Sequence, residues 1–379
     1  MIIDLKAISI IKINSTNTKT AFFGFKTKQR PFTIFGPCSA ESEIQLLETA
    51  KALKTHFNQN LFRAGVWKPR TRPGSFEGAG LEALNWLQTV KQETGFPVAT
   101  EVANTAHVEA CLRAGIDVVW IGARTTVNPF QVQEIADALQ GSGVGVMVKN
   151  PINPDINLWL GAIERIQKVG IQEVAAIHRG FQTSEQSVYR YPPHWHMAIE
   201  FKRQRNDIPV ITDCSHIAGT PELIPVIAQK SMDLAMDGLM IETHINPKVA
   251  LSDAKQQITP DLLSQIFDEL LIRQINSADD QLVTTLETIR ALIDDADDQM
   301  IRSLLNRIEL VNQIGQFKKD KNITIFQVER WKTIFDRQIQ FAKETGINAD
   351  FIEKLYRIIH EESIRIQNEI FNQPDKSSN

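Results

Sequence analysis

The sequence has few cysteines, no excess of positive charge and no long uninterrupted apolar run. Its three cysteines, Cys38, Cys111 and Cys214, are too few and too widely spaced for a disulfide framework. A formal net charge of −4 is unlike the basic balance of a dedicated nucleic-acid-binding protein. No apolar stretch approaches the roughly 18 residues of a membrane-spanning helix, and charges interrupt the apolar N-terminal stretch, which argues against a secretory signal. We therefore expect a cytoplasmic protein that binds neither nucleic acid nor membrane.

What the sequence does contain is a short apolar run that recurs eight times, each time followed by a stretch with helical spacing. The runs are nearly continuous rather than alternating, as is typical of parallel strands covered on both faces. They occupy residues 31–38, 61–67, 96–102, 118–123, 144–150, 174–180, 208–214 and 238–244. Eight such units favour a (β/α)8 TIM barrel, with a doubly wound open sheet as the structural alternative.

After residue 260 the rhythm changes and no further β run follows. Apolar residues recur mostly three or four positions apart between 282 and 314, which predicts one long amphipathic helix. Two more helical stretches follow at 327–345 and 349–372. The predicted parts of the chain are an N-terminal arm or hairpin, the barrel, a helical linker, an all-α domain and a disordered tail, at 1–30, 31–260, 261–280, 281–372 and 373–379.

Side chains that bind metals collect at the C-terminal ends of the predicted strands, where the active site of a (β/α)8 barrel lies. The candidate ligands follow the first, seventh and eighth strands and are Cys38, His216, Glu242 and Asp253. Barrel closure makes these three strands neighbours. A thiolate, an imidazole and two carboxylates suit a divalent transition metal, with Mn²⁺ expected first and Fe²⁺, Co²⁺ or Zn²⁺ as alternatives.

Cations follow the second, fourth, fifth and sixth strands. They are Arg63, Lys68, Arg70, Arg124, Lys149 and Arg179. Taken singly, a strand-end arginine or lysine is more often a surface or ion-paired residue. Their common position at one rim instead favours a substrate with several negative groups, since arginine makes forked contacts to carboxylate or phosphate and lysine supplies a point charge.

The motifs at these strand ends resemble those of 3-deoxy-D-arabino-heptulosonate 7-phosphate (DAHP) synthases. The matching stretches are GPCS, RAGVWKPRT, ATEV, IGART, HRG, DCSH and IETH with LSD, spread over 31–260. The resemblance implies a metal-dependent barrel that condenses phosphoenolpyruvate with erythrose 4-phosphate. Related synthases of an eight-carbon sugar acid carry a KAN-type sequence where KPRT stands here, and are therefore the weaker match.

The same resemblance implies roles for individual residues. The metal ligands would be the four candidates named above. The phosphoenolpyruvate clamp would comprise Arg63, Lys68, Arg124, Lys149 and Arg179, with Ala123 as a further substrate-binding position. The erythrose 4-phosphate site would be the turn of Lys68, Pro69, Arg70 and Thr71. Lys68 would be the catalytic residue of the barrel, and Glu101 would help to hold the attacking water.

The helical part resembles an all-helical chorismate mutase, in LETIRALIDDADDQMIRSLLNRIELVNQIGQFKKDK and in IIHEESIRIQ. The resemblance implies an intertwined homodimer that converts chorismate to prephenate by electrostatic catalysis. The implied site residues are Arg290, Arg307 and Arg330 for the carboxylates, Lys318 and Gln367 for the ether oxygen, and Ser363 as a further binding position. Gln327 and Trp331 stand where the family often has acids, which puts hydrogen bonding to the chorismate hydroxyl in doubt.

Helix geometry places Arg290 too far from Arg307 for one ligand. Arg307 and Lys318 are eleven positions apart and would share one helix face, about 16 Å apart. Arg290 precedes Arg307 by seventeen positions, which is about 25 Å along the axis and about 100° around it. If Arg290 contributes to the site, a second protomer must supply it. Periodicity alone also fits a solvated face on a dimerising helix.

Three functional hypotheses remain open from the sequence. In the first, the chain is a bifunctional DAHP synthase and chorismate mutase, with prephenate as a feedback inhibitor of the barrel. In the second, the helical domain only senses its ligand and dimerises. In the third, the barrel is an aldolase that uses Lys149 as a Schiff-base nucleophile.

Overall fold

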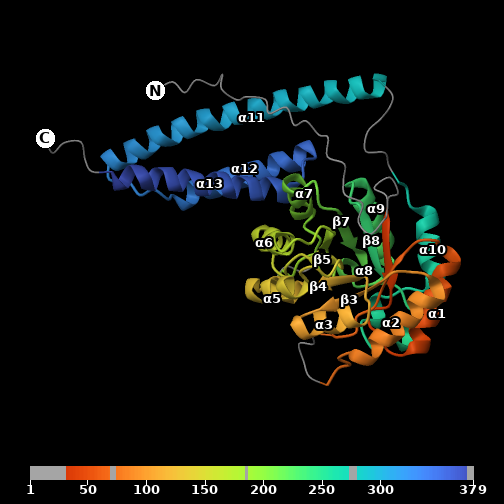
Figure 1. Cartoon of the computed structure of the whole chain (residues 1–379). Coiled ribbons are helices and arrows are strands. Elements are labelled where there is room, and N and C mark those ends of the chain that lie inside the picture. The colour runs from red at the N-terminus through yellow and green to blue at the C-terminus, as the bar shows by residue number, and fades with distance from the viewer. Residues whose placement is uncertain (1–30, 69–73, 184–186, 273–279, 374–379) are drawn as a thin grey trace. The chain divides into compact units, whose positions relative to one another are not determined.

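The computed structural model describes residues 31–68, 74–183, 187–272 and 280–373. The chain divides into two compact units, Met1–Ile275 and Asn276–Asn379 (Figure 1). The expected arm at 1–30, most of the expected tail, and the binding positions Pro69, Arg70 and Thr71 lie outside the described residues. Each unit is described by itself below.

The first unit is a closed barrel of eight parallel strands, which confirms the (β/α)8 prediction and rejects the open sheet. The strands are β1 (Phe32–Gly36), β2 (Leu61–Arg63), β3 (Val98–Val102), β4 (Val118–Ile121), β5 (Gly145–Lys149), β6 (Val174–His178), β7 (Val210–Asp213) and β8 (Gly238–Glu242). Each pairs with its neighbours in sequence, and β8 pairs with β1 to close the ring, with Gly36 opposite Glu242. The last residues of β8 and β1 are therefore adjacent.

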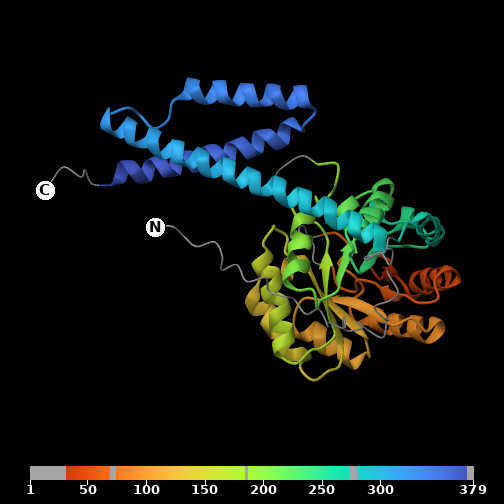
Figure 2. The same ribbon diagram turned by 90° about the horizontal axis from the view of Figure 1, so that it is seen from above.

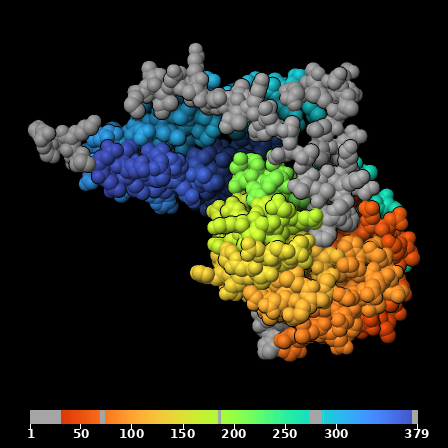
Figure 3. All heavy atoms as spheres, in the orientation of Figure 1, coloured from red at the N-terminus to blue at the C-terminus, as the bar shows by residue number. Residues whose placement is uncertain are grey.

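Helices surround the strands, as Figure 2 shows. They are α1 (Glu43–His56), α2 (Leu81–Thr94), α3 (Thr105–Arg113), α5 (Pro129–Leu139), α6 (Ile156–Lys168), α7 (Trp195–Gln204) and α9 (Ile224–Asp233), with short α4 (Ala123–Thr126) and α8 (Cys214–Ala218) at strand ends. Polar N-caps set several starts; Ser42, for example, accepts from Gln45 N–H at the start of α1. One buried apolar cluster fills the barrel and another lies between strands and helices. On the face seen in Figure 3 the helices and loops hide the strands.

Helix α10 (Pro260–Glu269) falls in the stretch where the sequence predicts a linker. It packs against α1, and its Leu263 is fully buried in the barrel core. The Phe267 ring lies 5.3 Å from the rings of both Phe35 and Phe57. This helix therefore closes the first unit, and the passage to the second lies after it.

The second unit consists of α11 (Asp280–Asp320), α12 (Val328–Thr345) and α13 (Ala349–Asn372). Both α11 and α12 pack against α13. Within the described part of this unit, the buried apolar side chains are limited to Val311, Ala342 and Ile366. None of the described helices, α11 included, is both long and apolar enough to cross a membrane.

Candidate active sites

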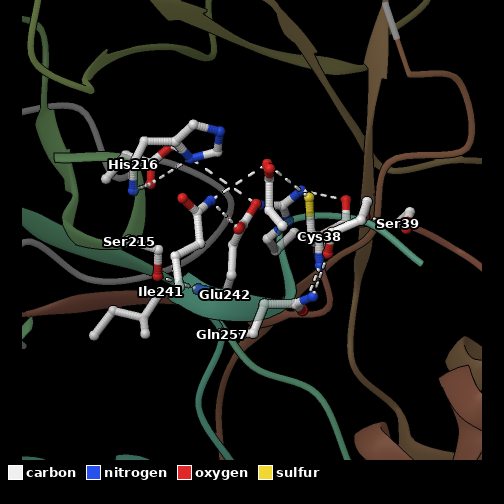
Figure 4. Close-up of polar contacts among 12 residues, drawn as sticks. Cys38, Ser39, Ser215, His216, Ile241, Glu242 and Gln257 are labelled. Atoms are coloured by element: carbon white, nitrogen blue, oxygen red, sulfur yellow. Dashed lines mark hydrogen bonds and ion pairs between the residues drawn. The ribbon is translucent and has the colours of Figure 1, made fainter. Parts of the chain in front are cut away.

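Three of the four candidate metal ligands lie together at the ends of β1 and β8. The ligand atoms of Cys38, Glu242 and Asp253 all lie within 4.8 Å of one another. Cys38 Sγ is 3.5 Å from Asp253 Oδ2. Asp253 has a φ of 45°, which is uncommon for a residue other than glycine and is held by the loop around it. Figure 4 shows Cys38 and Glu242 within this polar cluster.

His216, the fourth candidate, lies beside this group and is held by Asp213. Its Nδ1 is 2.9 Å from Asp213 Oδ2 and 3.9 Å from Glu242 Oε1. Asp213 ends β7 and also accepts the backbone N–H of His216, so it caps α8 and orients the ring at the same time. The imidazole therefore faces the carboxylates but has a carboxylate partner of its own.

The chemistry of this donor set fits a divalent cation. Burial raises the pKa of the Cys38 thiol to about 12, with a further contribution from the negative charge of Glu242. A thiol and two carboxylates gathered this closely repel one another in their charged forms. A bound divalent cation would offset that repulsion and favour the thiolate. Cys38, Glu242 and Asp253 would hold such an ion, with His216 as the adjacent fourth donor.

Arg63 differs from its expected place among the substrate contacts. Its Nη1 donates to Glu242 Oε1 at 2.8 Å and its Nη2 donates to the Cys38 carbonyl at 3.0 Å. Its guanidinium also lies 4.9 Å from the Trp120 ring centroid. The side chain is only 1% exposed and is not among the residues that line the neighbouring cavity. In this structure Arg63 therefore positions two candidate metal ligands, Glu242 and Cys38, without reaching the cavity itself.

A cavity of about 240 Å³ opens beside the candidate ligands. Five of the expected binding positions line it, namely Lys68, Ala123, Arg124, Lys149 and Arg179. His216, Asp253 and Glu101 also line it. The structure thus brings cations from β4, β5 and β6 to the same hollow as the candidate metal ligands, which suits a substrate with several negative groups.

Lys149 makes a buried ion pair with Asp213 at the bottom of this cavity. Its Nζ donates to Asp213 Oδ2 at 2.8 Å. Burial alone would raise the pKa of Asp213, but the charges of His216 and Lys149 outweigh it and hold that pKa well below its usual range. An amine engaged by a buried carboxylate suits a fixed positive charge better than a Schiff-base nucleophile.

Two further residues of the cavity, Arg190 and Tyr191, escaped the sequence reasoning. Arg190 Nη1 lies 3.3 Å from Asp253 Oδ1. Arg179 lies over the Tyr191 ring, with its guanidinium carbon 3.5 Å from the centroid. The chain passes so close at this point that a Cβ on Gly180 would clash with the Tyr191 carbonyl. Loop residues far from a strand end carry no periodic pattern, so periodicity could not have found Arg190 or Tyr191. The only signal in the sequence is Gly180, the glycine that follows β6.

Gly122→Ala is expected to impair the barrel reaction without destabilising the fold. A Cβ at this position would clash with the Glu101 carboxylate, which accepts from Trp120 Nε1 at 3.0 Å. The flexible end of Glu101 would move, so we expect about a tenfold fall in kcat/KM with a change of less than ~1 kcal/mol in unfolding free energy. Steady-state kinetics and thermal denaturation measure the two effects. Gly161→Ala is the matched control, since a Cβ there meets open space; equal activity losses in both variants would contradict the prediction.

A second group of polar residues lies between α11 and α13. Arg307 Nη1 donates to Ser363 Oγ at 2.7 Å, and Gln367 Nε2 donates to the Ser363 carbonyl at 3.0 Å. Lys318 Nζ donates to the Ile325 carbonyl at 2.5 Å, just beyond the end of α11. Four of the predicted helical site residues thus come from facing sides of two helices.

Arg290 and Arg330 are exposed, on α11 and α12 respectively. Helix α11 is continuous from Asp280 to Asp320, so the axial separation of about 25 Å between Arg290 and Arg307 applies in the folded chain. Within one chain these two arginines cannot share a small ligand. Arg290 can therefore have its predicted role only at the site of a second protomer.

Comparisons with known proteins match both parts of the chain. Residues 15–275 match the model of the DAHP synthetase I family, and residues 289–368 match that of chorismate mutase type II. The chain is 29% identical over 240 residues to the phospho-2-dehydro-3-deoxyheptonate aldolase of Thermotoga maritima, covering 63% of this chain and 69% of that protein. It is 28% identical over 287 residues to the 2-dehydro-3-deoxyphosphooctonate aldolase of Helicobacter pylori, covering 68% and 98%.

A solved structure gives the same comparison in three dimensions. The crystal structure of a Thermotoga maritima phospho-2-dehydro-3-deoxyheptonate aldolase (DAHP synthase) matches with a TM-score of 0.57 at 28% sequence identity. The match covers 63% of this chain and 68% of that one.

Proposed function

The chain belongs to the DAHP synthetase I family and carries a chorismate mutase domain after its barrel, and on that premise we propose which residues perform each reaction. The first reaction condenses phosphoenolpyruvate with erythrose 4-phosphate and releases phosphate. The second rearranges chorismate to prephenate. The observation that carries the first assignment is one cavity lined by four cations and two candidate metal ligands. These are Lys68, Arg124, Lys149 and Arg179, with His216 and Asp253.

In the barrel, cations hold the phosphoenolpyruvate. Arg124 and Arg179 would make forked contacts to its anionic groups, while Lys149, fixed by Asp213, supplies a charge at the floor. Lys68 donates to the Cys38 carbonyl at 2.8 Å, which places its ammonium between the metal ligands and the cavity. These residues would lower the repulsion between two anionic substrates and align the enol carbon with the aldehyde.

The divalent ion, Mn²⁺ in this proposal, would supply Lewis-acid polarisation of the aldehyde oxygen when bound. Glu101 borders the cavity and would hold the water that adds to C2, accepting its proton as the new bond forms. Cleavage of the C–O bond of the phosphate ester then releases phosphate. Arg190 and Tyr191 would complete the anion-binding wall beside Asp253.

An assay on the purified full chain tests this assignment. Phosphoenolpyruvate is supplied with either erythrose 4-phosphate or arabinose 5-phosphate, with and without a chelator, and phosphate release is measured. We expect turnover with erythrose 4-phosphate that the chelator abolishes and that Mn²⁺ restores. Preference for arabinose 5-phosphate would assign the chain to the chemistry named for the Helicobacter relative. Turnover that continues in the presence of the chelator would instead favour the alternative in which Lys149 forms a Schiff base.

In the helical unit, Arg307 would bind one carboxylate of chorismate, and Lys318 and Gln367 would donate to the ether oxygen as its charge grows. Ser363 positions Arg307 through their hydrogen bond. Arg330 and the partner-supplied Arg290 would serve the remaining carboxylate. Prephenate formation by the full chain tests this; a chain without it would retain only the ligand-sensing role.

We also propose a homodimer formed by the helical unit. Its long helix exposes an apolar series that a monomer would leave in water. The residues are Leu292, Ile293, Met300, Ile301, Leu305, Leu310, Ile314 and Phe317. A second copy covering this series would bring Arg290 to the site it cannot reach within its own chain. Sedimentation equilibrium should give twice the 42.8 kDa chain mass; a monomer at micromolar concentration would rule this arrangement out.

Prephenate is proposed as a feedback inhibitor of the barrel. The reason is that one chain joins the DAHP synthase reaction to a mutase reaction that comes later in the same pathway. The concentration of prephenate, the mutase product, therefore rises when the pathway is supplied with enough DAHP. Adding prephenate to the synthase assay should lower the rate. An unchanged rate at saturating prephenate would reject the proposal.

A cytoplasmic location is consistent with the cysteines, all three of which are free and buried. Fractionation of the source cells with a chain-specific antibody would test it, and recovery outside the cytoplasm would contradict it.

A further inference from the structure

One face of α13 carries three polar side chains, two of which contact α11. His360, Ser363 and Gln367 are spaced by three and four positions, so they form one stripe along the helix. Ser363 receives the hydrogen bond of Arg307 from α11. Gln367 packs close to α11 as well, because a Cβ on Gly315 would lie 3.1 Å from its Cγ. The stripe therefore lies close to Arg307 and Lys318, which are proposed to bind the ligand.

The two ends of this stripe each present a buried polar atom that has no hydrogen-bond partner. These atoms are His360 Nε2 and Gln367 Oε1. A buried polar atom without a partner is costly, and a ligand that supplies the missing hydrogen bond is one physical reason for its presence. Seven helical positions separate the two residues, which is about 10 Å along the axis. A ligand between the helices could satisfy both atoms. The mechanism proposed above uses Gln367 as a donor through Nε2, so it uses neither of these two atoms.

His360 is held in a fixed orientation by aromatic neighbours. Its ring stacks on Trp331 of α12 with centroids 3.8 Å apart and planes at 16°. The ring of Phe326, before α12, has its centroid 5.7 Å from that of His360. Burial lowers the pKa of the imidazole, and the charges of Arg307 and Lys318 lower it further against the opposing effect of Glu361. The ring is therefore neutral near pH 7 and can donate or accept one hydrogen bond at Nε2.

Resting on the mutase function above, we propose that His360 is a substrate-binding residue whose Nε2 hydrogen-bonds the hydroxyl group of chorismate. The orphaned buried atom, its place on the stripe with Ser363 and Gln367, and its aromatic clamp carry this inference. Trp331 is a positioning residue, because its ring stacks on the imidazole and fixes its orientation but does not contact the ligand through a polar atom.

The hydroxyl is a better partner for His360 than either carboxylate of the ligand. A neutral ring between Trp331 and Phe326 offers one hydrogen bond in apolar surroundings, which suits an uncharged group. The carboxylates require charge, and arginine provides it with forked geometry. Gln327 and Trp331 cannot present a carboxylate to the hydroxyl, so His360 supplies the polar contact in this chain.

The test compares chorismate with its analogue lacking the ring hydroxyl, on the full chain. Wild type should lose about tenfold in kcat/KM with the analogue, the effect of one neutral hydrogen bond. His360→Phe keeps the stacking surface and should lose about tenfold with chorismate, while showing almost no further loss with the analogue. His360→Gln, whose amide nitrogen can reach the place of Nε2, should recover part of the difference. Thermal denaturation shows whether each variant is folded.

Several outcomes would overturn the inference. Equal kcat/KM of the wild type for chorismate and for the analogue would already contradict it. A kcat/KM of His360→Phe for chorismate within twofold of the wild-type value would contradict it too, as would an undiminished loss of kcat/KM when His360→Phe is given the analogue. Glu361→Gln on the exposed side of α13 is the control and should match wild type. If wild type makes no prephenate at all, the proposed mutase function fails instead, and isothermal titration of the full chain with chorismate then tests His360 by affinity alone.

Discussion

Cys38→Ala is expected to abolish DAHP formation, with a loss on the order of a thousandfold or more. The thiol is fully buried and within 4.8 Å of the ligand atoms of Glu242 and Asp253, so removing it leaves two neighbouring carboxylates with fewer bonds to a shared ion. Loss of a metal that supplies several kcal/mol of transition-state stabilisation accounts for this magnitude. Elemental analysis should show metal close to one per chain in wild type and close to none in the variant.

A second buried cysteine provides the control for this experiment. Cys111 lies in α3, is 1% exposed, and has its pKa raised to about 12 by burial, as Cys38 has. The two thiols differ in their neighbours, because Cys111 packs among apolar side chains. Cys111→Ala should therefore keep its metal and its activity while losing some stability, by about 1 kcal/mol. Full metal content in Cys38→Ala would refute the ligand assignment.

Arg307→Ala is expected to lower mutase kcat/KM by roughly 10²–10³-fold while leaving the barrel reaction unchanged. The guanidinium is half-buried, donates to Ser363 Oγ at 2.7 Å, and has its pKa lowered by burial, so its charge is partly shielded from water. A charge in such a place contributes more to binding a dianion than one on the surface. Because the barrel is a separate compact unit, DAHP formation by the same preparation should be unchanged, and circular dichroism with thermal denaturation shows whether the helical unit of the variant is folded.

Another arginine of the helical unit serves as the matched control. Arg365 is exposed on α13 and is paired with Glu362 and Glu369, at 2.6 and 2.5 Å. Arg365→Ala removes the same charge from the same unit and should leave mutase activity within twofold. Comparable losses in the two variants would show that net charge, rather than the position of Arg307, governs the reaction.

Much of this molecule follows from local patterns. Each of the eight strands falls inside an apolar run of the sequence, because a strand covered on both faces must be apolar at successive positions. The three helices after residue 280 follow from a 3.6-residue period, which holds whatever the helices pack against. The rim position of Lys68, Arg124, Lys149 and Arg179 follows from the rule that strand ends in such a barrel share one face.

Contacts between distant positions depend on the folded chain. Arg63 ends β2 and Arg179 directly follows β6, yet only Arg179 lines the cavity. Arg63 instead pairs with Glu242, which is 179 positions later in the sequence. Arg190 reaches Asp253 through a loop without periodicity. His360 meets Trp331 because α12 packs against α13. Periodicity specifies which face a residue occupies, but the partner on that face is chosen by packing, which joins segments that the sequence keeps far apart.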